Sequence, residues 1–132
     1  MRSLHFMALT LVLAACGASA PNVAEVSASA GSAKACKSAA TFTSSAVPQL
    51  QKDGCTACHA GTDTSATAAL DLTNVGKDNA AACSLALRAV NLADRSQSAI
   101  IQAAVGAQAH AGGKVADTQA FTQAMRGWID NE

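Results

Sequence analysis

The feature that most constrains this chain is the pentapeptide Cys55-Thr56-Ala57-Cys58-His59. Cys-x-x-Cys-His is the covalent attachment signal for a c-type haem. In such a site Cys55 and Cys58 bond the haem as thioethers, and His59 is the proximal ligand of the iron. We therefore expect the chain to fold around one covalently bound haem c. Two rival interpretations are half of a zinc site, which needs two further ligands, and a chance pair of cysteines.

The N-terminus has the features of an export signal. A positively charged start, residues 1–3, precedes an apolar run over residues 6–13. The run is well short of the roughly 20 residues that a membrane-spanning helix needs. The sequence therefore predicts an exported chain, and export is the route on which bacterial c-type haems are attached.

The apolar run ends in Leu13-Ala14-Ala15-Cys16, which resembles the lipobox of bacterial lipoproteins. That resemblance implies a signal peptide over residues 1–15, cleavage before Cys16 and lipid on this cysteine. An ordinary signal peptide with an incidental cysteine is the alternative. Because Gly17 is not the Asp associated with inner-membrane retention in some bacteria, we prefer the periplasmic side of the outer membrane or the cell surface to the inner membrane.

The charge of the chain gives no sign of a nucleic-acid partner. Nine Lys and Arg balance nine Asp and Glu, with no strongly basic stretch. The expected partners are redox proteins, which the sequence does not identify, and a membrane reached through lipid on Cys16. Charge does not select among possible redox partners.

Each of the five cysteines can be given a role. Once Cys16, Cys55 and Cys58 are assigned, Cys36 and Cys83 remain, and in an oxidising compartment two such thiols most simply pair with each other. Their disulfide would stabilise the fold by roughly 4 kcal/mol in the chain-entropy model. A zinc site built from the four cysteines that follow Cys16 would leave His59 unexplained.

Composition divides the remaining chain into a tether and one domain. Residues 16–40 are rich in Ala, Ser and Gly and cannot build a core, so the folded domain is expected over residues 41–132. Helical spacing and capping residues predict helices over residues 44–54, 78–90, 96–105 and 117–130, and composition predicts a loop over 63–69. In the first helix, Pro48 is expected in the opening turn. No strand pattern competes, so the fold class is all-α.

Several parts of the domain together carry a family resemblance. They are Phe42, Val47, Pro48 and Leu50, the segment Cys55 to His59, Leu70-Asp71-Leu72, His110-Ala111-Gly112-Gly113 and Trp128-Ile129. The chain resembles a monohaem c-type cytochrome. The resemblance implies a cytochrome c-like fold of three to five helices wrapped around the haem, with an N-terminal helix crossing a C-terminal one. The chain departs from the respiratory type by lacking a Met in a loop just before the last helix.

That departure leaves three possibilities for the sixth iron ligand. His110 precedes the last helix, where related domains supply the distal ligand, and the following glycines permit a tight loop. Met125 is the alternative, although its position in the helical stripe favours a core role. The third possibility is an open or water-bound position. We expect His110 to bind, giving bis-His ligation.

A six-coordinate haem with two protein ligands moves single electrons and leaves no position for a substrate on the metal. We therefore expect an electron carrier and not an enzyme. The alternatives are a haem-based sensor or peroxidase-like site with an open sixth position, and an accessory lipoprotein of a larger redox complex. No acid/base pair, nucleophile elbow or phosphate loop supports other chemistry.

Overall fold

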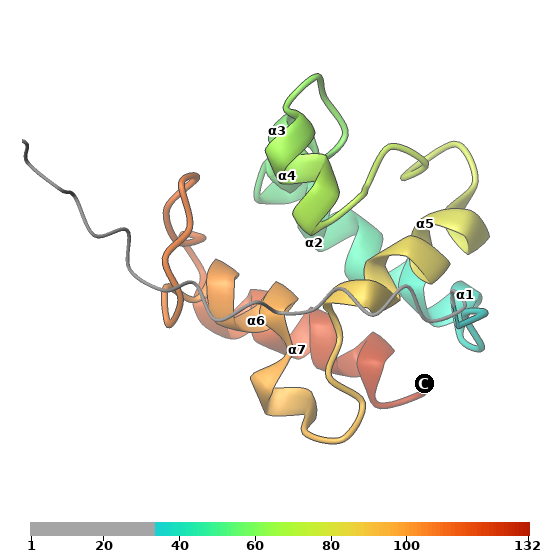
Figure 1. The fold of residues 1–132 in the computed structure, drawn as a ribbon. Helices are drawn as coiled ribbons and strands as arrows, with labels where there is room; N and C mark the ends of the chain where they lie inside the picture. Colours follow the sequence, from blue (N-terminus) through green and yellow to red (C-terminus); the bar gives the residue numbers. More distant parts are fainter. Residues whose placement is uncertain (1–33) are drawn as a thin grey trace, which may run out of the picture.

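The computed structural model describes residues 34–132, and every regular element in that range is helical. In chain order the elements are α1 (Ala39–Thr41), the π-helix η1 (Phe42–Ala46), α2 (Val47–Lys52), α3 (Cys55–His59), α4 (Thr64–Ala69), α5 (Asn79–Ala86), the 3₁₀-helices η2 (Leu87–Ala89) and η3 (Arg95–Gln97), α6 (Ala99–Ala104) and α7 (Thr118–Ile129) (Figure 1). The all-α prediction is confirmed for this part of the chain.

Two parts of the sequence-based interpretation concern membranes. The predicted signal peptide over residues 1–15, the predicted lipid on Cys16 and the part of the predicted tether up to residue 33 lie outside the described residues. Within residues 34–132, no helix has the length and apolar character needed to span a bilayer.

The first helical run begins earlier than the sequence predicts. It starts at Ala39, not at residue 44, so Pro48 lies inside the run and not in its opening turn. Proline has no N–H to donate to the carbonyl four residues back, and its ring crowds that carbonyl. The turn just before Pro48 is correspondingly widened, and the Val47 N–H donates to the Phe42 carbonyl, a π-helical bond.

Residues 63–69, predicted to be a loop, are mostly helical. The Asp63 side chain accepts hydrogen bonds from the N–H groups of Ser65 and Ala66, at 3.0 and 2.9 Å, and α4 follows it. Such a cap satisfies donors that the first helical turn leaves unpaired, and small polar residues can continue the helix. With α3 and α4, the helices are shorter and more numerous than the three to five that the sequence predicts.

The later helices begin where the sequence predicts in two cases out of three. Asp78 caps α5 and Asp117 caps α7, each accepting a backbone N–H in the first turn. The helix predicted to begin at Ser96 is instead divided, because Asp94 accepts the Ser96 N–H and forms the short η3. The α-helical part then begins at Ala99.

The core lies where α7 packs against the first helical run, on η1 and α2. The Phe42 and Trp128 rings meet edge to face with centroids 4.8 Å apart, a geometry that adds about 0.5–1.5 kcal/mol to the burial of their area. The apolar stripe predicted for the last helix is confirmed. Its buried members are Phe121, Met125, Trp128 and Ile129.

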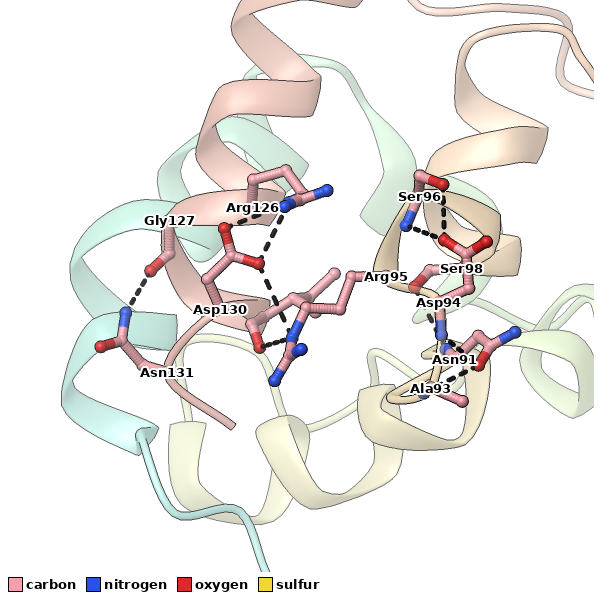
Figure 2. Close-up of polar contacts among 11 residues, drawn as sticks. Asn91, Ala93, Asp94, Arg95, Ser96, Ser98, Arg126, Gly127, Asp130 and Asn131 are labelled. Carbon is pink, nitrogen blue, oxygen red and sulfur yellow. Dashed lines mark hydrogen bonds and ion pairs between the residues drawn. The ribbon is translucent and has the colours of Figure 1, made fainter.

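A polar network joins the end of α7 to the turn before α6 (Figure 2). Arg95 Nε donates to the Ile129 carbonyl at 3.2 Å and lies 3.6 Å from the Asp130 carboxylate. Arg126 Nε lies 3.1 Å from the same carboxylate. Because these groups are exposed, each ion pair contributes at most about 1 kcal/mol. The network orients the two segments more than it stabilises them.

The predicted disulfide is confirmed. Cys36 and Cys83 are bonded, with their Cα atoms 5.7 Å apart, and the bond ties the segment before α1 to α5. The Cys36 N–H also donates to the Ser84 hydroxyl of α5 at 3.2 Å. The chain therefore packs against the domain from Cys36 onward, a few residues before residue 41, where the sequence places the domain boundary.

Glu132 fastens the same N-terminal segment to α7. Its carboxylate accepts hydrogen bonds from the N–H groups of Lys37 and Ser38, both at 3.1 Å, and from Trp128 Nε1 at 3.1 Å. Burial by itself would raise the pKa of the Glu132 carboxyl. Hydrogen bonds from Ser38, Lys37 and Trp128 outweigh burial and lower that pKa below its ordinary value.

We expect Glu132→Gln to lower the free energy of unfolding by about 1 kcal/mol at neutral pH, because the charge that strengthens these hydrogen bonds is lost. Glu132→Ala should cost about 2 kcal/mol or more, since it also leaves the buried Trp128 donor unpaired. Urea unfolding checks both values.

A carboxyl whose pKa is lowered in the folded state stabilises the protein above its unfolded pKa, and this contribution is lost as pH falls through the folded pKa. The difference between wild type and Glu132→Gln should therefore be full at neutral pH and shrink below about pH 4.5. An equal difference at every pH would contradict the role of the charge.

Candidate functional site

The Cys-x-x-Cys-His motif forms its own short helix, α3, after a sharp turn. Gly54 has a left-handed backbone, with φ of 72°, and separates α2 from α3. Glycine adopts this conformation without the steric penalty of a side chain. Within the single turn that follows, Cys55 is half-buried, Cys58 is exposed and His59 is only 8% exposed.

The orientation of His59 is set by backbone carbonyls outside its helix. Nδ1 lies 2.8 Å from the Ala66 carbonyl oxygen and 2.9 Å from that of Leu70. Because carbonyl oxygens only accept hydrogen bonds, Nδ1 is the nitrogen that carries the proton in the neutral ring, and the lone pair is then on Nε2. A donor bond from the second ring nitrogen is the usual arrangement around a metal-binding histidine. The Leu72 N–H donates to the carbonyl of His59 at 2.9 Å and holds the backbone as well.

His110 has the same tautomer, set in a different way. It lies in the exposed segment between α6 and α7, and its Nδ1 is 2.9 Å from the Gly113 carbonyl oxygen. Nδ1 therefore donates here too, leaving the Nε2 lone pair free. Gly112 permits this turn, since a Cβ at its position would lie 3.1 Å from Cε1 of the His110 ring.

The two imidazoles lie close together in a stacked, nearly parallel arrangement. Their ring centroids are 5.9 Å apart and their planes differ by 8°. Two imidazoles that bind one metal from opposite sides, each through a bond of about 2 Å, would have ring centres about 6 Å apart. The separation of the rings and the two Nε2 atoms, which form no hydrogen bond within residues 34–132, are compatible with one metal bound by both His59 and His110.

Two cavities adjoin this pair, of ≈ 230 and ≈ 370 Å³. Cys55, Ala69 and both histidines line both of them. The first continues into apolar side chains of the core, among them Leu50, Leu70, Ile100 and Phe121. The second is bordered by Cys58, Asp53, Asp63 and Lys114. Cofactor sites usually occupy about 300–1,000 Å³, so the two cavities together offer the space that a large cofactor needs, with apolar walls in the first and charged side chains at the border of the second.

Met125, the alternative sixth ligand, is held elsewhere. It is fully buried on α7 within the apolar core, and it lines neither cavity. The structure therefore brings His110 to His59 and leaves Met125 in the packing role that its helical stripe predicts.

The four cysteines within residues 34–132 are arranged in two separate sets, the disulfide pair and the motif pair. Burial, with a smaller effect of Asp53, raises the pKa of the Cys55 thiol to about 11, so it is protonated at neutral pH. Metal binding needs the thiolate form. Within residues 34–132, three metal-ligating side chains gather only at Cys36, Cys83 and Glu132. There the two sulfurs are joined as a disulfide, and this set does not include the motif cysteines.

The residues present thus fit a c-type haem better than a zinc ion. Cys55 and Cys58 lie beside His59 at the cavities, where thioether bonds would form. Zinc would need four ligand atoms gathered around one point, and within residues 34–132 Cys55, Cys58 and His59 form no such cluster, with or without a fourth side chain.

The sequence did not predict the backbone groups that orient His59. The carbonyls of Ala66 and Leu70 act through the backbone, which residue type does not reveal. Asp63 was the available signal, because an Asp before a run of small residues predicts a helix start. That start curves the chain so that both carbonyls face His59.

The chain was compared with models of protein families, with curated protein sequences and with solved structures, and none of them matches it.

Gly61, directly after the motif helix, gives a test of this local geometry. A Cβ there would lie 2.7 Å from the Ala57 carbonyl oxygen, so the backbone must shift. We expect Gly61→Ala to lower the free energy of unfolding by about 1–3 kcal/mol. The control is Gly127→Ala in α7, where the added Cβ meets Ser45 at an ordinary 3.8 Å. The control should unfold no more easily than wild type in urea, and equal losses in the two variants would contradict the prediction.

Proposed function

We propose that the chain is an exported monohaem c-type cytochrome that transfers electrons through a haem with bis-His ligation. The observation that carries the proposal is the pair of parallel imidazoles, His59 and His110, with ring centroids 5.9 Å apart and Nδ1 of each ring donating to a carbonyl. The motif cysteines lie beside this pair.

The chain's residues divide the work of the site. Cys55 and Cys58 hold the haem covalently, and His59 and His110 present their Nε2 atoms to its iron. When bound, the haem iron supplies reversible one-electron chemistry, accepting one electron as it goes from ferric to ferrous and returning it without proton transfer. The two protein ligands leave no coordination position for a substrate, which favours an electron carrier over an enzyme.

The environment of the pair suits electron transfer at the surface. The buried Leu50, Ile100 and Phe121 give one cavity an apolar wall, while the exposed Cys58 and Lys114 give the other a polar edge. A partner could therefore approach the polar edge closely without any movement of the core. The partner is an unidentified redox protein, since the balanced charge of the chain selects none.

The fold supports a cytochrome c-like assignment, which remains part of the proposal. The first helical run packs against α7 through Phe42 and Trp128, in agreement with the crossing of N- and C-terminal helices that the resemblance implies. Short helices carry the motif and its surroundings, and the site lies beside the helix crossing and not within it.

The proposal includes export and a lipid anchor. The Cys36–Cys83 disulfide suits an oxidising compartment, because disulfides are rare in reducing ones. The sequence of residues 1–16 supports a cleaved signal peptide and lipid on Cys16. The outer membrane or the cell surface is the preferred location.

Covalent attachment is tested by expressing the full chain in a bacterium that attaches haem to exported proteins. The purified protein should keep its haem through denaturing electrophoresis, seen by haem staining. A variant with both Cys55→Ser and Cys58→Ser should lose the stain, because both thioether bonds are removed. A Cys36→Ser, Cys83→Ser variant is the control and should keep it. If the Cys36→Ser, Cys83→Ser control also loses the stain, the assignment of haem attachment to Cys55 and Cys58 is not supported.

The axial ligands are tested by absorption spectra of the haem-bearing protein. Wild type should be six-coordinate and low-spin, His110→Ala should lose this spectrum, and Met125→Ala should keep it. The midpoint potential should lie below that of His/Met cytochromes in comparable surroundings, because an axial Met raises the potential. A low-spin His110→Ala together with an altered Met125→Ala would show that the sixth ligand is Met125.

A further inference from the structure

The two histidines of the site are held with unequal strength. His59 is 8% exposed, and carbonyls of Ala66 and Leu70, which lie in and after α4, hold its ring. His110 is exposed, and its ring is held by Gly113, a residue of its own turn. Moving His59 therefore disturbs another helix, whereas moving His110 disturbs only the turn that carries it.

The segment around His110 is joined to the fold only at its ends. Before it, the N–H groups of Ala107 and Gln108 donate to the Gln102 carbonyl, and after it Val115 donates to Ala104. Between these points, residues 109–113 form hydrogen bonds only with one another, among all the partners that residues 34–132 provide. In Figure 1 this segment is the loop that stands out from the helices between α6 and α7.

Opening this turn would expose little core. Every residue from 106 to 114 is already exposed, so moving the segment uncovers no buried apolar side chain of its own. Local opening is least costly where few apolar contacts and few hydrogen bonds are broken. His110 can therefore leave its position while the core and His59 stay in place.

We propose that His110 is a displaceable ligand, and that the position it vacates binds a small uncharged diatomic gas of the carbon monoxide class. This inference rests on the proposed function, because it requires the iron to lie between the two histidines. It makes the chain a gas-binding protein as well as an electron carrier.

The oxidation state of the iron selects the ligand class. A ferrous haem iron binds small neutral molecules such as carbon monoxide, whereas most anions bind the ferric form. Ala109 and Phe121, which line the cavity beside His110, add no charge there, and the polarity of the surroundings decides what a haem iron binds.

The exchange is a substitution at the metal and involves no net oxidation or reduction. The bond between His110 Nε2 and the iron breaks, and a bond from the iron to the carbon of carbon monoxide forms. No proton or electron is transferred. The iron must be ferrous, and dithionite supplies that electron before the gas is added.

The experiment uses the haem-bearing full chain, reduced with dithionite and mixed with carbon monoxide, and follows the absorption spectrum. Because His110 must leave first, the rate of adduct formation in wild type should level off as the carbon monoxide concentration rises. In His110→Ala the rate should keep rising with concentration. At the highest concentration it should exceed the wild-type rate by about tenfold or more, since dissociation of His110 limits the wild-type rate there.

Gly112→Ala tests the role of the turn itself. The added Cβ would lie 3.1 Å from Cε1 of the His110 ring, so the ring has to move. We expect the plateau rate of this variant to rise by about tenfold, because the crowded ring binds the iron less well. Gly127→Ala is the matched control on α7 and should keep the wild-type plateau.

The outcomes separate this inference from the proposed function. If wild type is low-spin before the gas is added and forms no adduct, while His110→Ala does, His110 is not displaceable and this inference alone is wrong. If the spectrum before mixing is not that of a bis-His haem, the ligand assignment fails, and this inference falls with it. A wild-type rate equal to that of His110→Ala would likewise overturn it.

Discussion

The edge-to-face contact of Phe42 with Trp128 joins the beginning of the described chain to its end, and the site depends on it. Both rings are fully buried, and they hold α7 against η1 and α2. The motif helix follows α2 after one turn, and the segment carrying His110 precedes α7. The distance between the two histidines is therefore set largely by the packing of helices that carry neither of them. Glu132 strengthens the same junction by accepting hydrogen bonds from Trp128 and from the segment before α1.

Around this junction the two sides of the site differ in physical character. His59 is buried and tied to carbonyls of another element, which suits a ligand that stays in place through repeated changes of charge. His110 is exposed and tied to its own turn. The disulfide and the Glu132 contacts brace the far end of the fold and leave the His110 turn free of long-range restraint. Stability is thus concentrated away from the ligand that we propose to be exchangeable, where it does not oppose the movement of that ligand.

The sequence correctly predicted the helices whose position depends on one local interaction. The stripe of α7 and the starts of α5 and α7 are confirmed, because a buried face and a capped first turn act within a few residues. Predictions failed where two signals competed. Pro48 suggested a helix start, but the preceding residues bury Phe42 and continue the helix around it through a widened turn. The polar residues after Asp63 suggested a loop, but the cap was the stronger signal.

The sequence by itself determined which side chains are available to bind a cofactor or form a disulfide. They are the two motif cysteines, the motif histidine, one further histidine after it, and two cysteines left to pair. It also determined the absence of strand patterns, because apolar residues recur at helical spacing. Only the tertiary structure decided that His110 lies opposite His59 while Met125 is buried in the core. Only there is it seen that both imidazoles donate from Nδ1. These facts depend on distances between residues far apart in the chain and on the direction of backbone carbonyls, and neither is encoded in local residue patterns.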